Sequence, residues 1–457
     1  MKKVKFKQCL LALSISAAAW TTASVYAGEQ KPGNAESMAA NQLSQIIATA
    51  LTNDDSRRQF YAQAQAMRAT GKASSTQQDP KLKFGVSGLP VDSFAFDEDA
   101  MTNISAGISQ QFGRGDTLEL NSVKANQQAS GIELKVTARE LEVINAITKV
   151  WLELGYQQVA HKILLENKQL MEELEAFIQT NYSIGKSEAQ DLINAQLQVT
   201  KLDEKLQANA QTQQRLTAQL SEWLGSDWLL SANQLQASNT LDWSVLQALE
   251  NTASNGNYYS RLNQYPTVRM VDASIEASRT QVDIAKESYA PQFGVEMAYG
   301  YRQANNMKGE PASDVVSAFI TMDIPLFTGN RQDQNLAAAQ YQVGAAQSQK
   351  DTLLKQLNAK VNSLFVDQNN LSQRIERFES TLIPQAISQV KATERGYQNN
   401  TAQFNDVILA TRDELALKLE YQRLITDLNL TNNNLSALLN SYQYQVDTPQ
   451  LATSSEQ

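Results

Sequence analysis

The sequence has little of the residues with which most enzymes do their chemistry, since its 457 residues include one cysteine and one histidine. That scarcity excludes a Cys/His zinc cluster, a structural disulfide and a Cys–His dyad. Excess positive charge is also missing: 39 basic against 48 acidic side chains give a net charge of -9, which argues against a nucleic-acid partner. Nine prolines and 42% apolar residues favour long, rather polar helices. We therefore expect no enzyme activity, no metal site and no cofactor.

The first 27 residues have the pattern of a signal peptide. Four lysines lie within the first seven residues, an apolar stretch runs over 9–19, and small residues at Val25 and Ala27 predict cleavage before Gly28. Cys9 lies too early for lipidation, and the apolar stretch is too short for a membrane anchor. No later run of about 18 apolar residues predicts a transmembrane helix. We expect an exported, non-lipidated protein whose charge changes from -9 to -13 when the four lysines are removed.

Most of the remaining chain consists of two copies of one unit, offset by 215 positions. The matching pairs are Phe112 and Phe327, Tyr182 and Tyr397, Asp191 and Asp406, Ala195 and Ala410, Leu202 and Leu417, and Leu224 and Leu439. The register holds without a gap from Tyr182 to Leu224, as expected where length is under structural constraint. Upstream, residues 83–86 resemble 292–295 at an offset of 209, so the second copy has the longer loop.

Each copy begins with two short segments of alternating polarity. In 293–302, five apolar residues alternate with small or polar ones: Phe293, Val295, Met297, Tyr299 and Tyr301. A period of two predicts β-strands with one apolar face. The sequence predicts strands at 82–88 and 102–112 in the first copy, and at 292–303 and 314–325 in the second.

Long helical segments follow the strands. Residues 115–182 contain no proline and have apolar residues at spacings of three and four, which predicts a helix of about 100 Å. The second copy has a similar segment at 330–397, interrupted at Gly344, Pro384 and Gly396. Shorter return helices are predicted at 188–224 and 403–439. A helix at 267–290 and another near 54–70 would complete the return arms.

These patterns predict a mostly α protein with a small β part and a repeated layout. Its segments are a signal peptide (1–27), N-terminal helices (28–81), a first repeat (82–225, with a helical hairpin at 115–225), an equatorial linker (226–266), a second repeat (267–440, with a helical hairpin at 330–440) and a C-terminal tail (441–457).

The strands have the length of outer-membrane β-strands. Four strands cannot close a barrel, and an open edge in lipid leaves unpaired backbone groups, so the chain must share its sheet with copies of itself. Two copies give little lumen, whereas three give a twelve-stranded barrel with a channel. We expect the strand charges Glu296, Arg302 and Asp323 to face that lumen. A soluble sheet edge with Tyr299 and Tyr301 as surface aromatics is the alternative, and the signal peptide and long helices disfavour it.

Six segments, in the right order, resemble the TolC family of outer-membrane efflux proteins. They are the strand entrance at 290–294, the strand exits at 324–331 and 111–115, the tip at 182–185 with Asp191–Leu192 after it, and the tip at Tyr397 followed by 406–408. The resemblance implies a homotrimer in which a twelve-stranded outer-membrane β-barrel continues into a periplasmic α-helical tunnel. It also implies a periplasmic adaptor protein, an inner-membrane RND or ABC pump, and a channel without catalytic activity.

The resemblance places four residues at the periplasmic gate: Tyr182, Asp191, Tyr397 and Asp406. A ring of carboxylates there would attract cations and latch the aperture. The alternative is that an acidic residue early in a helix only complements the helix dipole. Ala402 and Leu409 depart from the family pattern, in which an arginine latch and a second ring acid occur, so we expect a weaker electrostatic filter.

The substrate stays open at the level of sequence. Residues 99–102 and 109–115 are similar to a segment of heavy-metal efflux channels of the CzcC/CusC branch, which favours metal-ion export. Drug efflux and type I protein secretion are the alternatives, and specificity would lie in the pump. The competing class of protein is a periplasmic coiled-coil adaptor or scaffold without a pore, which leaves the four alternating strands unexplained.

Overall fold

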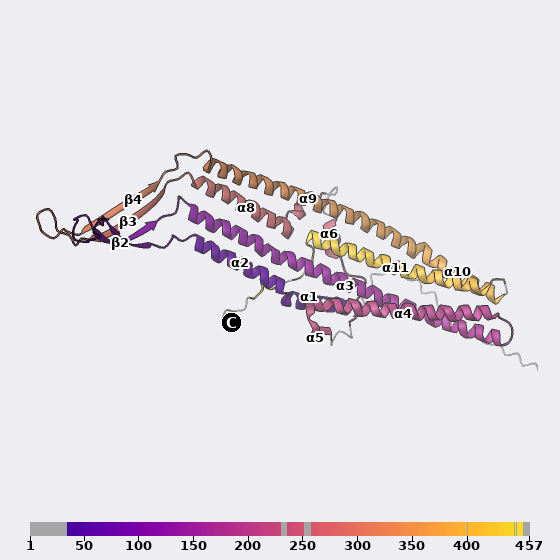
Figure 1. Ribbon diagram of the computed structural model, residues 1–457. Helices are drawn as coiled ribbons and strands as arrows, with labels where there is room; N and C mark the ends of the chain where they lie inside the picture. The colour runs from indigo at the N-terminus through magenta and orange to yellow at the C-terminus, as the bar shows by residue number, and fades with distance from the viewer. Residues whose placement is uncertain are drawn as a thin grey trace, which may run out of the picture.

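The molecule has a β-sheet at one end and long helices that run from it to the other end (Figure 1). The computed structural model describes residues 34–229, 235–250, 257–399, 401–442, 444 and 446–450. The predicted signal peptide at 1–27 and the last seven residues of the predicted tail lie outside the described residues. The described chain is mostly helical with a small antiparallel sheet, which confirms the predicted fold class.

Both repeats contribute strands to one four-stranded antiparallel sheet, in the order β1-β2-β3-β4. The strands are β1 (Lys81–Ser87), β2 (Asn103–Gln111), β3 (Gln292–Tyr301) and β4 (Val315–Asp323). The register pairs Phe84 with Ala106, Ala106 with Tyr299, and Tyr299 with Val316. The two hairpins are therefore joined through β2 and β3, although about 180 residues separate them in the sequence.

The predicted strand at 292–303 is too long at its outer end, because β3 ends at Tyr301. The backbone N–H of Arg302 donates to the Asp314 carboxylate at 3.0 Å, so the side chain of a loop residue takes the place of a strand carbonyl. Arg302 was predicted as a strand charge and instead lies one residue beyond the strand.

Two helical hairpins make up the rest of the length. The first consists of α3 (Thr117–Ser183) and α4 (Ala189–Leu224). In the second, α9 (Gln332–Arg377), a π-helical turn (Phe378–Leu382) and α10 (Ile383–Gln398) form one continuous arm that returns as α11 (Phe404–Leu439). Over the described residues, no helix combines the length and the apolar character that crossing a membrane requires.

Each return arm is completed by helices from elsewhere in the chain (Figure 1). The line of α4 is continued by α1 (Asn34–Asn53) and α2 (Asp55–Ser74), and the line of α11 by α8 (Pro266–Glu287). The helix predicted near 54–70 is α2, and α1 precedes it and ends next to Asp54. The Asp54 carboxylate accepts a hydrogen bond from the Arg57 backbone N–H at 2.7 Å and caps α2.

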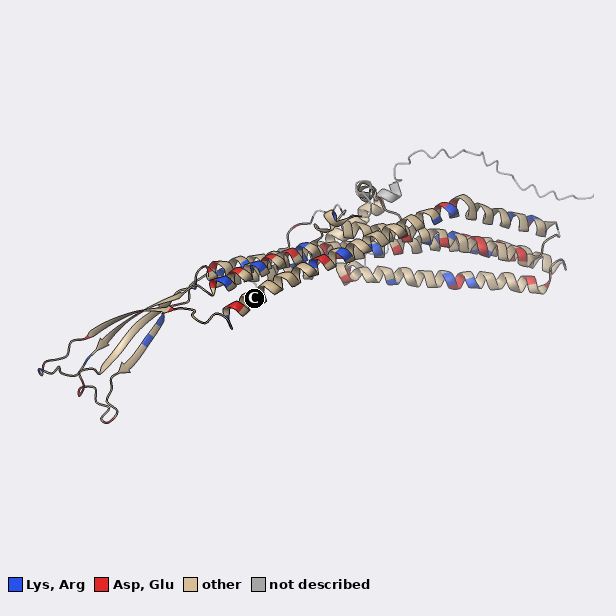
Figure 2. Ribbon diagram, turned by 90° about the horizontal axis from the view of Figure 1, so that it is seen from above, with Lys and Arg blue, Asp and Glu red and all other residues tan. Residues whose placement is uncertain are grey.

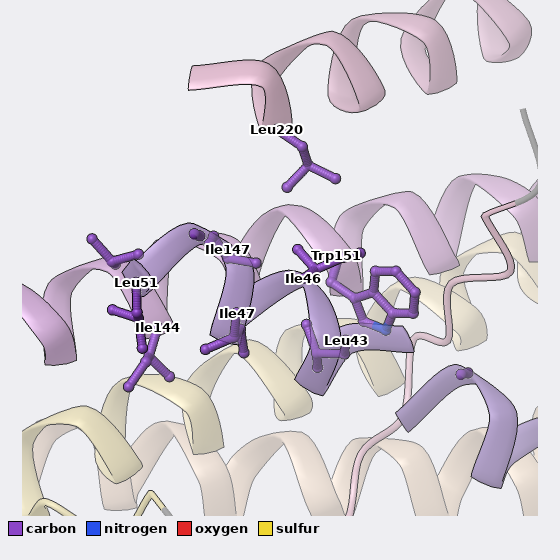
Figure 3. Packing of buried hydrophobic residues seen from close by; sticks show 11 residues of the cluster. Leu43, Ile46, Ile47, Leu51, Ile144, Ile147, Trp151 and Leu220 are labelled. Carbon is purple, nitrogen blue, oxygen red and sulfur yellow. The ribbon is translucent and has the colours of Figure 1, made fainter. Parts of the chain in front are cut away.

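The apolar core is divided into separate clusters along the helices. One joins α1, α3 and the end of α4 through buried side chains such as Ile47, Ile147, Trp151 and Leu220 (Figure 3). Another joins the end of α11 to α9 and to the start of α8, where Val268 and Leu435 are fully buried. Because each cluster involves only one side of a helix, much of the helix surface remains available for contact with other molecules.

The described parts of the predicted linker at 226–266, called the collar below, lie near the middle of the long helices (Figure 1). It includes α5 (Ser226–Leu229), α6 (Ser244–Glu250) and α7 (Tyr259–Leu262). The segment before α6 lies directly on α3 at Gly155, where an added Cβ would come within 2.2 Å of the Ser238 carbonyl carbon. The Asn429 side-chain oxygen of α11 accepts hydrogen bonds from the Leu241 backbone N–H at 3.0 Å and from Trp243 Nε1 at 2.8 Å.

Candidate functional site

One face of the sheet is apolar on all four strands, and it is exposed. The residues on it are Leu82, Phe84, Val86, Ile104, Ile108, Val295, Met297, Tyr299, Val316, Ile320 and Met322. Phe84 is 80% exposed and Ile320 is 81% exposed. Soluble monomers rarely expose a continuous apolar surface of this kind, whereas the outer surface of a membrane β-barrel requires one. Figure 2 shows that the sheet carries few charged residues, while both signs of charge recur along the helices.

The opposite face of the sheet is polar and carries two ion pairs. Lys83 of β1 pairs with Glu296 of β3 across β2, where the partner of Lys83 in the register is Gly107, which has no side chain in the way. Arg114 pairs with Asp323 at the end of β4. Two of the predicted lumen charges, Glu296 and Asp323, therefore lie on the polar face, each with its own cation.

The third predicted lumen charge, Arg302, lies in the loop region beyond β3. Its guanidinium donates to the backbone oxygen of Ala100 at 3.3 Å and so joins the two loops at the outer end of the sheet. The cations Lys83 and Arg114 were missed from the sequence. The period of two in 81–87 places Lys83 on the polar face, so the signal for that residue was present.

The sheet has two edges that pair on one side only within the described strands. β1 and β4 are these edges, and they run in opposite directions because three antiparallel pairings separate them. A β4 edge placed beside the β1 edge of another copy thus continues the antiparallel order.

The far end of the molecule contains the four predicted gate residues, in two different settings. Tyr182 lies in the last turn of α3 and is 44% exposed. Its repeat mate Tyr397, in the last turn of α10, packs against Phe404 with the rings tilted by 55° and their centroids 5.8 Å apart. The equivalent of Phe404 in the first repeat is Ala189, so only the second tip has this aromatic contact.

The two carboxylates also differ in their contacts. Asp406 is exposed in the first turn of α11, and its Oδ2 accepts a hydrogen bond from the Gln403 backbone N–H at 2.9 Å. The Gln403 side chain in turn accepts from the Asp406 backbone, which completes a capping box. Asp191 lies in the first turn of α4, whose N-cap residue Glu188 makes no side-chain capping bond.

A small apolar cluster brings the two tips together. Ile178 of α3 and Ala195 of α4 pack with Phe404 and Ile408 of α11, and Tyr397 lies against the cluster. Three of these residues are less than 3% exposed. The periplasmic end predicted from two separate repeats is therefore one packed unit within a single chain.

Further from the tips, an ion-pair network also links the hairpins. The Arg423 guanidinium of α11 binds both carboxylate oxygens of Glu153 in α3, at 2.7 and 2.9 Å, and its carbon lies 5.2 Å from the Tyr156 ring centroid. Hydrogen bonding to Glu153 raises the pKa of Arg423, and Asp427 acts in the same direction. Among the residues that the structure describes, no group of three or more His, Cys, Asp or Glu side chains is placed to hold a metal ion.

Comparison with known proteins gives a sequence match for the second repeat. Residues 257–441 match the model of the outer membrane efflux protein family. A search of curated protein sequences found no match.

Comparison with solved structures covers most of the chain. A crystal structure of CusC is 16% identical, covers 87% of this chain and 92% of its own, and has a TM-score of 0.71. A membrane protein from Pseudomonas aeruginosa is 16% identical, covers 87% and 90%, and has a TM-score of 0.73. The outer membrane protein VceC from Vibrio cholerae is 18% identical, covers 87% and 95%, and has a TM-score of 0.68. At these identities the likeness concerns the fold.

Proposed function

We propose that this chain is a member of the outer membrane efflux protein family, whose model matches residues 257–441, and that three copies of it form the exit duct of a tripartite efflux or secretion system. The duct is passive: it catalyses no reaction, holds no cofactor, and opens a path for cargo driven by an inner-membrane pump. The observation that carries the proposal is the exposed apolar face of the sheet, which fits lipid and leaves the polar face for water.

The number of copies follows from the strand count. Four strands leave β1 and β4 as open edges, and each unpaired backbone group in lipid costs several kcal/mol. Eight strands enclose a space that side chains fill, whereas twelve leave a water-filled lumen. On this proposal, Glu296 and Asp323 face the lumen within the membrane, and Arg302 joins the loops at its outer mouth.

The packed tips are proposed as the periplasmic entrance and as the contact point for an adaptor protein. Three copies would bring three Asp406 and three Asp191 carboxylates around the axis, together with Tyr182 and Tyr397. The pump, of the RND or ABC class, would reach the duct through the adaptor. The candidate cargoes are metal ions, drugs and secreted proteins. The similarity of 99–102 and 109–115 to the CzcC/CusC branch favours metal ions.

A pore-free periplasmic adaptor or scaffold is the competing function. It accounts for the helical hairpins, but it leaves a wide apolar sheet face exposed to water. No contact in the described part of the chain covers that face.

Fractionation followed by electrical recording tests the function. We expect the full-length protein in the detergent-extracted outer membrane, and we expect the purified protein to form discrete ion-conducting pores in planar bilayers. Recovery in the soluble periplasm, together with no conductance, would support the scaffold and remove the channel.

A further inference from the structure

The polar face of the sheet is lined mainly by small residues. They are Gly85, Ser105, Gly107, Gly294, Ala298, Gly300 and Ser317. In a barrel built from this sheet, side chains of this size leave most of the lumen open. The larger residues near the middle of β3 and β4 therefore decide how wide the passage is.

These larger residues are Glu296 of β3 and Phe319 of β4, which are direct partners in the register. They lie on one level of the sheet, that is, in one row of register partners, which continues from Glu296 to Ser109 of β2 and from Ser109 to Lys81 of β1. Lys83 joins the same level through its ion pair with Glu296.

Phe319 is a large aromatic residue on this mainly polar face. It is 57% exposed, and it lies on the face opposite to Ile320, which is on the apolar surface. A lipid-facing role therefore does not explain Phe319. It also lies on the edge strand β4, beside the position that the next copy would occupy.

The charges at this level do not cancel. Lys81 and Lys83 face the single carboxylate of Glu296, which leaves one net positive charge per chain, whereas the whole chain has a net charge of -9. The ion pair also holds the Glu296 carboxylate towards β1, away from the Phe319 side of the sheet.

We propose that Phe319, Glu296, Lys83 and Lys81 form a constriction belt inside the barrel. The inference rests on the proposed trimeric channel. Three Phe319 rings narrow the lumen at mid-height, and the net positive charge beside them favours anions over cations of the same size. The belt is separate from the gate residues, which lie at the opposite end of the molecule (Figure 1).

The size of the passage is tested by single-channel recording in planar bilayers. F319A is expected to raise the conductance and F319W to lower it. S317A, on the same face one row away, and I320A, on the opposite face, are matched controls and are expected to conduct like the wild type. Trimer content is checked on a gel before each recording. If F319A does not assemble, the conductance of F319W alone tests whether residue 319 sets the width of the lumen.

The charge of the belt is tested by the reversal potential in a salt gradient. E296Q is expected to shift it towards anion selectivity, and K81Q towards cation selectivity. Equal conductance in F319A, F319W and S317A, or a reversal potential that E296Q leaves unchanged, overturns the belt. Absence of pores in the wild type overturns the channel itself, so the two failures are distinguishable.

Discussion

At the scale of single residues, Asp406 has two roles that its position alone does not separate. Its carboxylate accepts the Gln403 N–H and so stabilises the start of α11, and it also lies exposed at the tip where three copies would meet. A capping bond of this kind is worth about 1 kcal/mol. Asparagine keeps a side-chain oxygen as acceptor but removes the charge, so the two roles can be tested separately.

We predict that D406N lowers the cation selectivity of single channels and leaves the thermal stability nearly unchanged. D406A removes the capping acceptor as well, and we expect it to lower both selectivity and the free energy of unfolding, the latter by about 1 kcal/mol. D191A serves as the matched variant, because Glu188 makes no capping bond at the first tip. Reversal potentials and thermal melts in detergent measure the two effects. A reversal potential that D406N does not move excludes Asp406 from the filter.

The residues of the two ends differ in how far the sequence predicts them. The repeat register places Tyr182, Tyr397 and Asp406 at helix ends, because position within a repeat is a property of the sequence. The partner of Glu296 is not readable in this way, since the ion pair with Lys83 depends on two strand registers and on the gap at Gly107.

At the scale of secondary structure, Pro384 is predicted as an interruption, yet the arm containing it is continuous. A π-helical turn, Phe378–Leu382, comes directly before α10, and Pro384 lies in the first turn of α10. A proline ring clashes with the carbonyl four residues earlier and lacks an N–H donor. The wider π turn accommodates both defects at this point. The repeat mate of Pro384 is Gln169, an exposed residue within the uninterrupted α3.

This difference predicts opposite sensitivities at two equivalent positions. We expect P384A to change the free energy of unfolding by less than about 1 kcal/mol, because the backbone there is already adapted to proline. Q169P is expected to cost about 3 kcal/mol, because α3 has no such turn at Gln169. Far-UV circular dichroism during thermal unfolding measures both. A strongly destabilising P384A, or a harmless Q169P, would show that the π turn does not serve to accommodate the proline.

The collar shows why other elements escape prediction from sequence. Periodicity defines the strands and long helices, since their residues repeat every two or every three to four positions. The segment before α6 has no such period. Its path is set by contacts with distant residues, among them the open surface at Gly155 and the Asn429 side chain.

At the scale of the whole molecule, the chain is incomplete at its sheet and packed at its tips. The tips bury a cluster from both repeats within one chain, whereas β1 and β4 each have one unpaired edge among the described strands. Because the number of strands is even, identical copies can join edge to edge and remain antiparallel throughout. The strand directions within the chain are therefore compatible with closure of the proposed barrel.

Disulfide cross-linking tests this closure, and no native cysteine is expected to interfere with the engineered pairs. The only native cysteine is Cys9, which the predicted cleavage removes. S87C on β1 is combined with a cysteine placed in turn along β4 from Val315, which covers the unknown stagger between copies. Each disulfide joins β4 of one copy to β1 of the next, so we expect oxidised outer membranes to give covalent dimers and trimers and nothing larger.

The matched control replaces the edge cysteine by one on an inner strand. S105C on β2 lies in the same row as Val315 but two strands away, about 9 to 10 Å, which is too far for a disulfide within the chain. Since β3 covers the other side of β2, no neighbouring copy reaches it either, and S105C with V315C is expected to stay monomeric. If the largest covalent species were a dimer, a twelve-stranded barrel would be contradicted, because two copies supply eight strands. Covalent species larger than the trimer would mean that more than three copies join edge to edge, which would also contradict a twelve-stranded barrel.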